Sequence, residues 1–150
     1  MRSRRGTGVL LDTSFILPTL GIDVGGEVLR GLRALADSGL EVYYSRFSIL
    51  EALWVAARRL SSPEAREALS EGLTSILESG VYREVKEDAW VFAEAARLYA
   101  LGHRDMIDNI LYAASVRYNL RFLTLDRGLK EFVRRIGLRD TLVSPDELTA

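Results

Sequence analysis

Four acidic residues stand where their carboxylates could act together on a substrate. Asp12 follows the apolar run GVLL and Asp126 follows RFLTL, so both close segments with the composition of buried strands. Asp108 lies in the first turn of an apolar helical segment, and Glu51 lies at the border of another helix's apolar face. Because unpaired charge is costly near a core, we expect these acids to share a partner.

A divalent cation is the partner that this set of side chains favours. Carboxylates brought close together raise each other's pKa unless a cation neutralises them. The chain has no cysteine, and its single histidine, His103, cannot build a zinc site, so the expected ligands are oxygen atoms. Oxygen ligands select Mg²⁺ or Mn²⁺, as one or two ions. Such ions lower the pKa of an attacking water, which suits phosphodiester hydrolysis.

Each acid taken alone also has a structural explanation. The two acids at the strand ends could cap the helices that follow them, and Asp105 is most simply an N-cap. Asp108 could compensate a helix dipole, and Glu51 could pair with Arg58. Only the convergence of the four acids on one site makes a metal necessary.

The elements that must position these residues alternate between strand and helix. The carboxyl ends of parallel strands share one sheet edge, where ligands bind. Strands separated by helices of ten or more residues require a parallel sheet covered on both faces, so we predict a three-layer α/β/α sandwich. The predicted strands are 8–11, 40–44, 80–85, 121–125 and 138–143, and the predicted helices are a short one after Asp12, then 23–38, 45–60, 63–78, 88–101, 105–118 and 127–135.

Composition indicates one globular domain over residues 1–150, with a basic arm at 1–7. The chain is 48% hydrophobic and 27% charged, which is enough for one core and far from the disordered class. The absence of cysteine makes the cytoplasm the default compartment. The apolar run after the arm is too short for a signal peptide or a membrane span. Glutamine is absent and asparagine occurs twice, which fits a thermophile.

The charge balance permits a nucleic-acid substrate. The net charge is −1, but with the four acids set aside the remainder leans basic, and 18 of the 20 cationic side chains are arginine, which contacts phosphate in a bidentate manner. A solvated face is the simpler interpretation for each one. The candidate phosphate contacts are Arg46, Arg58, Arg59, Arg104, Arg127, Lys130, Arg134 and Arg135. Base stacking is conceivable, but core or dimer packing is favoured, for Tyr43, Tyr44, Phe47, Trp54 and Tyr112.

These acids and their surroundings resemble PIN-domain nucleases, particularly the VapC-type toxins of prokaryotic toxin–antitoxin pairs. The matching segments are VLLDTSFIL, SRFSILEALW, DMIDNILYAASV and RFLTLD, in the family's order and across nearly the whole chain. The resemblance implies a parallel sheet of about five strands and frequent homodimerisation. It also implies Mg²⁺- or Mn²⁺-dependent cleavage of RNA by activated water.

The resemblance assigns roles residue by residue. It implies that Asp12, Glu51, Asp108 and Asp126 ligate the metal and orient water. Hydrogen bonds to these ligands are expected from Thr13, Ser14 and Thr124, and a contact with water or phosphate from Asn109. Asp105 would be an accessory acid that competes with Asp108 for the third position; the run ILYAAS after Asp108 favours Asp108. The residues after Asp126 fit the family only loosely.

Partners and competing functions remain open. The apolar residues between Trp54 and Leu77 exceed what one small core needs, which suggests a homodimer or a groove for an antitoxin. A non-catalytic PIN-like scaffold that binds RNA or protein is one alternative, and an RNA-processing nuclease outside any toxin–antitoxin pair is another. Aspartyl-phosphate phosphatases need a second acid two residues after the strand-end aspartate, where Ser14 stands here.

Overall fold

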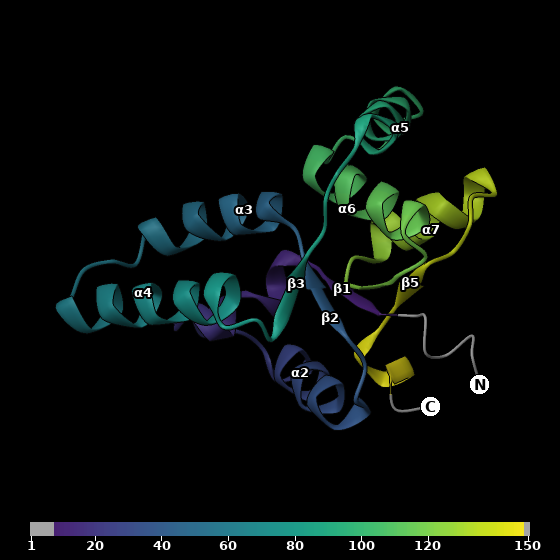
Figure 1. Ribbon diagram of the computed structural model, residues 1–150. Helices are drawn as coiled ribbons and strands as arrows, with labels where there is room; N and C mark the ends of the chain where they lie inside the picture. The colour runs from purple at the N-terminus through teal and green to yellow at the C-terminus, as the bar shows by residue number, and fades with distance from the viewer. Residues whose placement is uncertain (1–7, 149–150) are drawn as a thin grey trace.

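Five short strands form one parallel sheet in the computed structural model of the protein, which describes residues 8–148 (Figure 1). The strand order is β3-β2-β1-β4-β5, and every neighbouring pair is parallel. The predicted basic arm at 1–7 lies outside the described residues. The strands are β1 (Val9–Leu11), β2 (Val42–Tyr44), β3 (Tyr82–Glu84), β4 (Arg121–Leu123) and β5 (Leu142–Val143).

Helices connect successive strands, as the crossovers of a parallel sheet require. Three short 3₁₀ helices complete the fold. None of the described helices is long and apolar enough to cross a membrane. The helices are α2 (Gly26–Ser38), α3 (Arg46–Ala57), α4 (Pro63–Glu78), α5 (Ala89–Ala100), α6 (Met106–Arg117) and α7 (Arg127–Ile136), with η1 (Thr13–Phe15), η2 (Leu17–Leu20) and η3 (Pro145–Leu148).

The strand side chains divide the core into two halves. Leu10 and Phe122 lie in one half with the buried faces of α5, α6 and α7. Leu11 and Leu123, one residue further along each strand, lie in the other half with α2, α3 and α4. Figure 1 shows α5, α6 and α7 gathered on one side, with α3 and α4 projecting away from the sheet. The prediction of a three-layer α/β/α sandwich is confirmed.

The central strand is buried on both faces. Val9, Leu10 and Leu11 are at most 1% exposed, because helices cover the sheet above and below. This explains why the strand is a continuous apolar run in the sequence instead of an alternating one.

The last strand is shorter than predicted. It begins at Leu142, whereas the sequence indicated a strand over 138–143. Gly137, with φ 82°, ends α7 in the left-handed conformation, and the backbone N–H of Leu138 donates to the carbonyl of Val133 at 2.9 Å. Leu138 therefore packs on the core as part of the turn that ends the helix. Its apolar side chain extended the apolar run from which the longer strand was predicted.

Candidate active site

Asp12 and Thr124 face each other where β1 and β4 end. The backbone N–H of Asp12 donates to the carbonyl of Leu123 at 3.1 Å, so the strands still pair where the acid begins. The Thr124 hydroxyl donates to Asp12 Oδ2 at 2.8 Å, and the Thr13 N–H donates to Asp12 Oδ1 at 2.6 Å. Asp12 is therefore the cap of η1 and, at the same time, a carboxylate held at the sheet edge.

Glu51 reaches the same edge from α3. Ser45 caps this helix by accepting the N–H of Phe47 at 3.1 Å, which sets where the helix begins. The half-buried Glu51 side chain accepts a hydrogen bond of 2.5 Å from the Thr13 hydroxyl. In the described part of the chain Glu51 forms no ion pair with Arg58, the alternative partner that the sequence left open. The carboxylate is thus anchored toward Asp12.

Asp105 and Asp108 share the first turn of α6 but differ in surroundings. Asp105 is exposed and caps the helix, accepting the Asp108 N–H at 3.0 Å. Asp108 is 8% exposed. Burial, a hydrogen bond with Asp126 and the charges of nearby acids raise the pKa of Asp108 to about 9. Asp108, the buried acid of the two, is therefore the one that lies among the other acids of the site.

Asp126 follows β4 and caps α7. Its Oδ1 accepts the N–H of Leu129 at 3.0 Å, and its own N–H donates to the Thr124 hydroxyl at 3.1 Å. Burial opposes ionisation, but hydrogen bonds from Asp108 and from the Leu129 N–H lower the pKa of Asp126. Within this pair, Asp108 carries the proton and Asp126 the charge.

The acids of β1, α3, α6 and β4 act on one another electrostatically. Burial, opposed by the hydrogen bonds from Thr124 and Thr13, raises the pKa of Asp12 to about 6, and the charges of Glu51 and Asp126 add to the rise. Asp12 in turn contributes to the raised pKa of Asp108. A divalent cation fits this donor set, because carboxylate oxygens suit hard ions and the ion would neutralise the repulsion.

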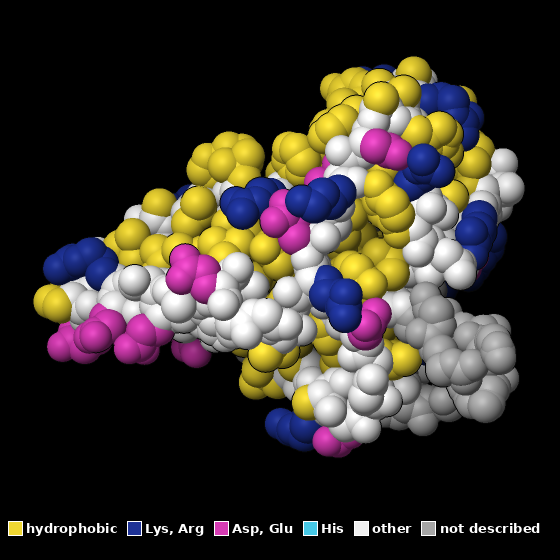
Figure 2. Space-filling view, viewed as in Figure 1, with side chains coloured by type: hydrophobic (Ala, Val, Ile, Leu, Met, Phe, Trp, Pro, Cys, Tyr) yellow, Lys and Arg dark blue, Asp and Glu magenta, His cyan; other side chains and the backbone are white. Residues whose placement is uncertain are grey.

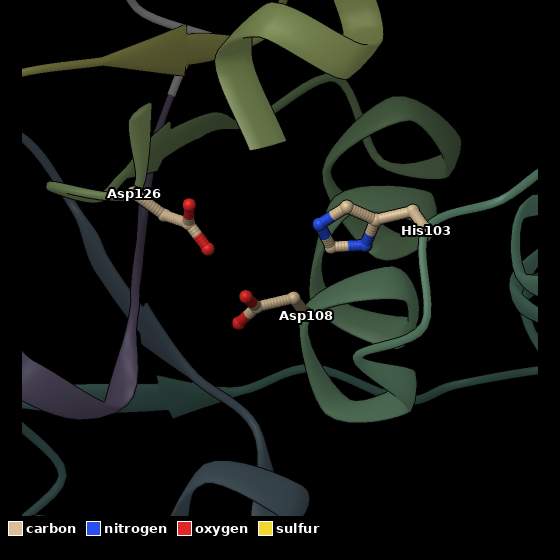
Figure 3. A group of neighbouring side chains, drawn as sticks. All are labelled: His103, Asp108 and Asp126. Atoms are coloured by element: carbon tan, nitrogen blue, oxygen red, sulfur yellow. The ribbon is translucent and has the colours of Figure 1, made fainter. Parts of the chain in front are cut away.

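His103 is a member of the site that the sequence reasoning missed. One ligand atom from each of His103, Asp108 and Asp126 lies within 4.8 Å of the others (Figure 3). The sequence analysis expected oxygen ligands alone, whereas this group also offers an imidazole nitrogen. A signal was present, because His103 lies two residues before the cap of the helix that carries Asp108.

Asn109 supports His103 from the buried side of α6. It has no exposed surface, its Oδ1 lies 2.8 Å from His103 Nδ1, and its amide nitrogen donates to the His103 carbonyl at 2.7 Å. A contact of Asn109 with water or phosphate, expected from the sequence, does not fit this burial. Ser14 is half-buried in η1, and its side chain forms no hydrogen bond with any residue that the structure describes.

The sequence of this chain matches the model of a known protein family. A family model described as "PIN domain" matches residues 9–134, which include all four acids and His103. The chain belongs to the PIN domain family. The match begins at β1 and ends inside α7, so it spans every element that contributes a side chain to the site.

Solved structures with the same fold include three bacterial proteins or complexes. Their identities are low, so they show the fold of this PIN domain only; no curated protein matches it in sequence. FitAcB from Neisseria gonorrhoeae is 21% identical (TM-score 0.64, covering 91% of this chain and 97% of that chain). VapC20 of Mycobacterium tuberculosis, described as a sarcin-ricin loop cleaving toxin, is 20% identical (0.62, 89% and 98%). VapBC2 from Rickettsia felis, bound to promoter DNA, is 13% identical (0.62, 91% and 97%).

Basic side chains near the acids of the PIN domain differ in whether another side chain already contacts them. Arg127 is exposed directly after Asp126 and forms no ion pair within residues 8–148. It borders a hollow of about 370 Å³ at the ends of β4 and β5, which Asp126 also lines. Four other candidates have partners. Arg46 pairs with Glu84 at 3.1 Å and Lys130 with Asp140 at 3.6 Å. The guanidinium of Arg104 lies 4.9 Å from the Tyr99 ring centroid and that of Arg135 lies 5.6 Å from the Phe132 ring centroid.

Most of the aromatic candidates are packing residues. Tyr44 and Tyr112 are buried in the two halves of the core, and Phe47 packs edge-on against Phe92 with ring centroids 5.6 Å apart. Trp54 differs, because 57% of its surface is exposed on α3. Base stacking therefore has little support from these residues.

Proposed function

We propose that this PIN domain is a Mg²⁺- or Mn²⁺-dependent endoribonuclease that hydrolyses RNA phosphodiester bonds with metal-activated water. The observation that carries the proposal is that Asp12 and Asp126 follow the paired strands β1 and β4, that Asp108 lies close to Asp126, and that the charge of Glu51 acts on Asp12. The pKa of Asp12 and the pKa of Asp108 are both raised. A divalent ion held there would lower the pKa of a water nucleophile and stabilise the leaving oxygen. The family membership supports nuclease chemistry.

The chain's own residues would prepare this site before substrate arrives. Thr124 and Thr13 hold Asp12, and Thr13 also holds Glu51, so these two carboxylates need little reorganisation to bind. Asp105 would act as an accessory acid by fixing the first turn of α6, which places Asp108. Ser14 stays a candidate hydrogen-bond donor to bound water or ligand.

RNA is the substrate that we propose. Arg127 is exposed beside Asp126 and forms no ion pair within residues 8–148, so its guanidinium could contact a phosphate group. VapC20, with the same fold, is described as a sarcin-ricin loop cleaving toxin. We further propose that this protein is the cytoplasmic toxin of a toxin–antitoxin pair, because one solved structure with the same fold is a toxin–antitoxin complex from Klebsiella pneumoniae.

We also propose that the protein forms a homodimer and that it binds an antitoxin. The basis is the exposed apolar outer face of α3. Leu50, Leu53 and Trp54 are 42%, 37% and 57% exposed and are all apolar. Figure 2 shows hydrophobic side chains gathered over this helix, whereas acidic side chains gather along the edge of α4. An apolar helix face in contact with water favours a protein partner.

The first test is cleavage of a labelled RNA with Mg²⁺ or Mn²⁺. We expect cleavage that chelation abolishes and that Asp12→Asn lowers by at least 100-fold. Asp37→Asn, which changes an exposed acid on α2, is the matched control and should cleave like wild type. Cleavage that survives both chelation and Asp12→Asn would overturn the mechanism; RNA binding without cleavage would favour the non-catalytic scaffold.

A second test separates a toxin from a processing nuclease. Induced expression of the wild-type protein should arrest growth, Asp12→Asn should not, and co-expression of the product of a neighbouring gene should restore growth. Active protein that never arrests growth would favour an RNA-processing role outside a toxin–antitoxin pair.

A further inference from the structure

The surroundings of Asn109 fix the tautomer of His103. The side-chain nitrogen of Asn109 lies 2.7 Å from the His103 carbonyl and 3.4 Å from the Ala95 carbonyl, and both carbonyls can only accept. The remaining atom, Oδ1, therefore faces His103 Nδ1 at 2.8 Å as an acceptor. Nδ1 must carry the hydrogen in this bond, which leaves the lone pair of the neutral ring on Nε2.

The free nitrogen is directed at the acids. Figure 3 shows one ring nitrogen of His103 turned toward the carboxyls of Asp126 and Asp108. Packing against Phe132, with ring centroids 5.3 Å apart, helps to fix the plane of the imidazole. A histidine oriented by a hydrogen bond at one nitrogen and presenting the other to carboxylates has the arrangement of a metal ligand.

We propose that Nε2 of His103 binds the same divalent ion as Asp108 and Asp126, and that this nitrogen ligand makes the site favour Mn²⁺ over Mg²⁺. The inference rests on the proposed metal site and adds a ligand and a metal preference to it. Mg²⁺ prefers oxygen ligands and retains its waters, whereas transition-metal ions accept imidazole nitrogen more readily. Asn109 on α6 and His103 in the preceding turn would therefore make the site select Mn²⁺ over Mg²⁺.

Because His103 is the only histidine in the chain, its bond to a metal can be observed without ambiguity. We would bind Mn²⁺ to the full-length protein without an affinity tag and record electron spin-echo modulation. We expect modulation from an imidazole nitrogen that changes when the histidine is labelled with ¹⁵N. The same signal should disappear in His103→Gln, a substitution that keeps a polar side chain and removes the imidazole.

Metal affinities give the second measurement. In calorimetry, wild type should bind Mn²⁺ more tightly than Mg²⁺, and His103→Gln should weaken Mn²⁺ binding by about tenfold or more while changing Mg²⁺ binding far less. Ser48→Ala is the control: Ser48 is buried on α3 and makes no side-chain hydrogen bond within the described residues, so both affinities should stay unchanged.

The outcomes separate this inference from the proposed function. Mn²⁺ bound with no imidazole modulation, or with an unchanged preference in His103→Gln, would overturn the nitrogen ligand and leave the carboxylate site standing. Failure of wild type to bind either ion would overturn both. If His103→Gln does not fold, the labelled wild-type protein decides the question alone.

Discussion

Thr13 in η1 donates a hydrogen bond of 2.5 Å to Glu51 in α3, a residue 38 positions further along the chain. The same threonine donates its backbone N–H to Asp12. One residue therefore positions two carboxylates that belong to different elements. Its hydroxyl is the contact that ties α3 to the end of β1 on the side of the site.

The first prediction tests this link. Thr13→Val keeps the volume and removes the hydroxyl, so Glu51 should lose its anchor, with a loss of metal affinity and of kcat/KM of about 10- to 100-fold. Thr13→Ser keeps the donor and should stay within a few-fold of wild type. Circular dichroism would verify folding in both. Full activity in Thr13→Val would show that Glu51 is positioned by other contacts.

The second prediction concerns stability against pH in the metal-free protein. The folded state holds a proton on Asp108, whose pKa is raised to about 9, and the unfolded chain releases that proton near pH 4. The folded state binds more protons between these values, so this contribution to stability is complete below about pH 4 and is lost as pH rises toward 9. Asp12, with its pKa raised to about 6, acts in the same direction.

Asp108→Asn should remove most of this dependence, because the amide cannot ionise. Thermal unfolding scans from pH 5 to 8.5 should show wild type losing Tm and the variant losing much less, with the variant at least about 3 °C more stable at pH 8. Mn²⁺ should stabilise wild type and have little effect on the variant. A wild-type Tm that rises over this range would contradict the raised pKa of Asp108.

The elements of this fold were predictable because their patterns are local. Apolar runs such as GVLL and caps such as Asp105 depend on near neighbours in the chain, and they appear in the structure close to the predicted positions. The pairing of β1 with β4, which brings Asp12 beside Thr124, joins segments far apart in the chain. The sequence alone did not determine which strands are neighbours in the sheet. This pairing follows from tertiary packing and could not be read from spacing.

The site was less predictable than the fold, for a reason that His103 illustrates. Its place beside Asp126 depends on the path of the turn between α5 and α6 and on the buried amide of Asn109. The resemblance to PIN-domain nucleases implied a contact of Asn109 with water or phosphate, whereas Asn109 lies on the buried side of α6. Side-chain orientation at a helix start is set by the partner element, and this information is absent from a single sequence.

The third prediction concerns how RNA is held. If Arg127 contacts a phosphate, Arg127→Gln should weaken RNA binding for all sequences alike. It should also lower the slope of log affinity against log salt by about 0.7, the value for one contact with a single strand. Arg66→Gln removes an exposed arginine on α4 and should leave the slope unchanged. Equal slopes in wild type and Arg127→Gln, measured by fluorescence anisotropy, would exclude the contact.

The last prediction concerns the apolar face of α3. Trp54 is exposed, so Trp54→Gln should leave the fold and Tm of one subunit nearly unchanged. If this face joins two subunits, wild type should scatter light as about twice the 16.8 kDa of one chain, and the variant should dissociate at concentrations at least tenfold higher. Val81→Gln, at a residue 69% exposed before β3, is the control and should stay dimeric. Wild type that remains monomeric, alone and with the neighbouring gene's product, would show that this face serves neither partner.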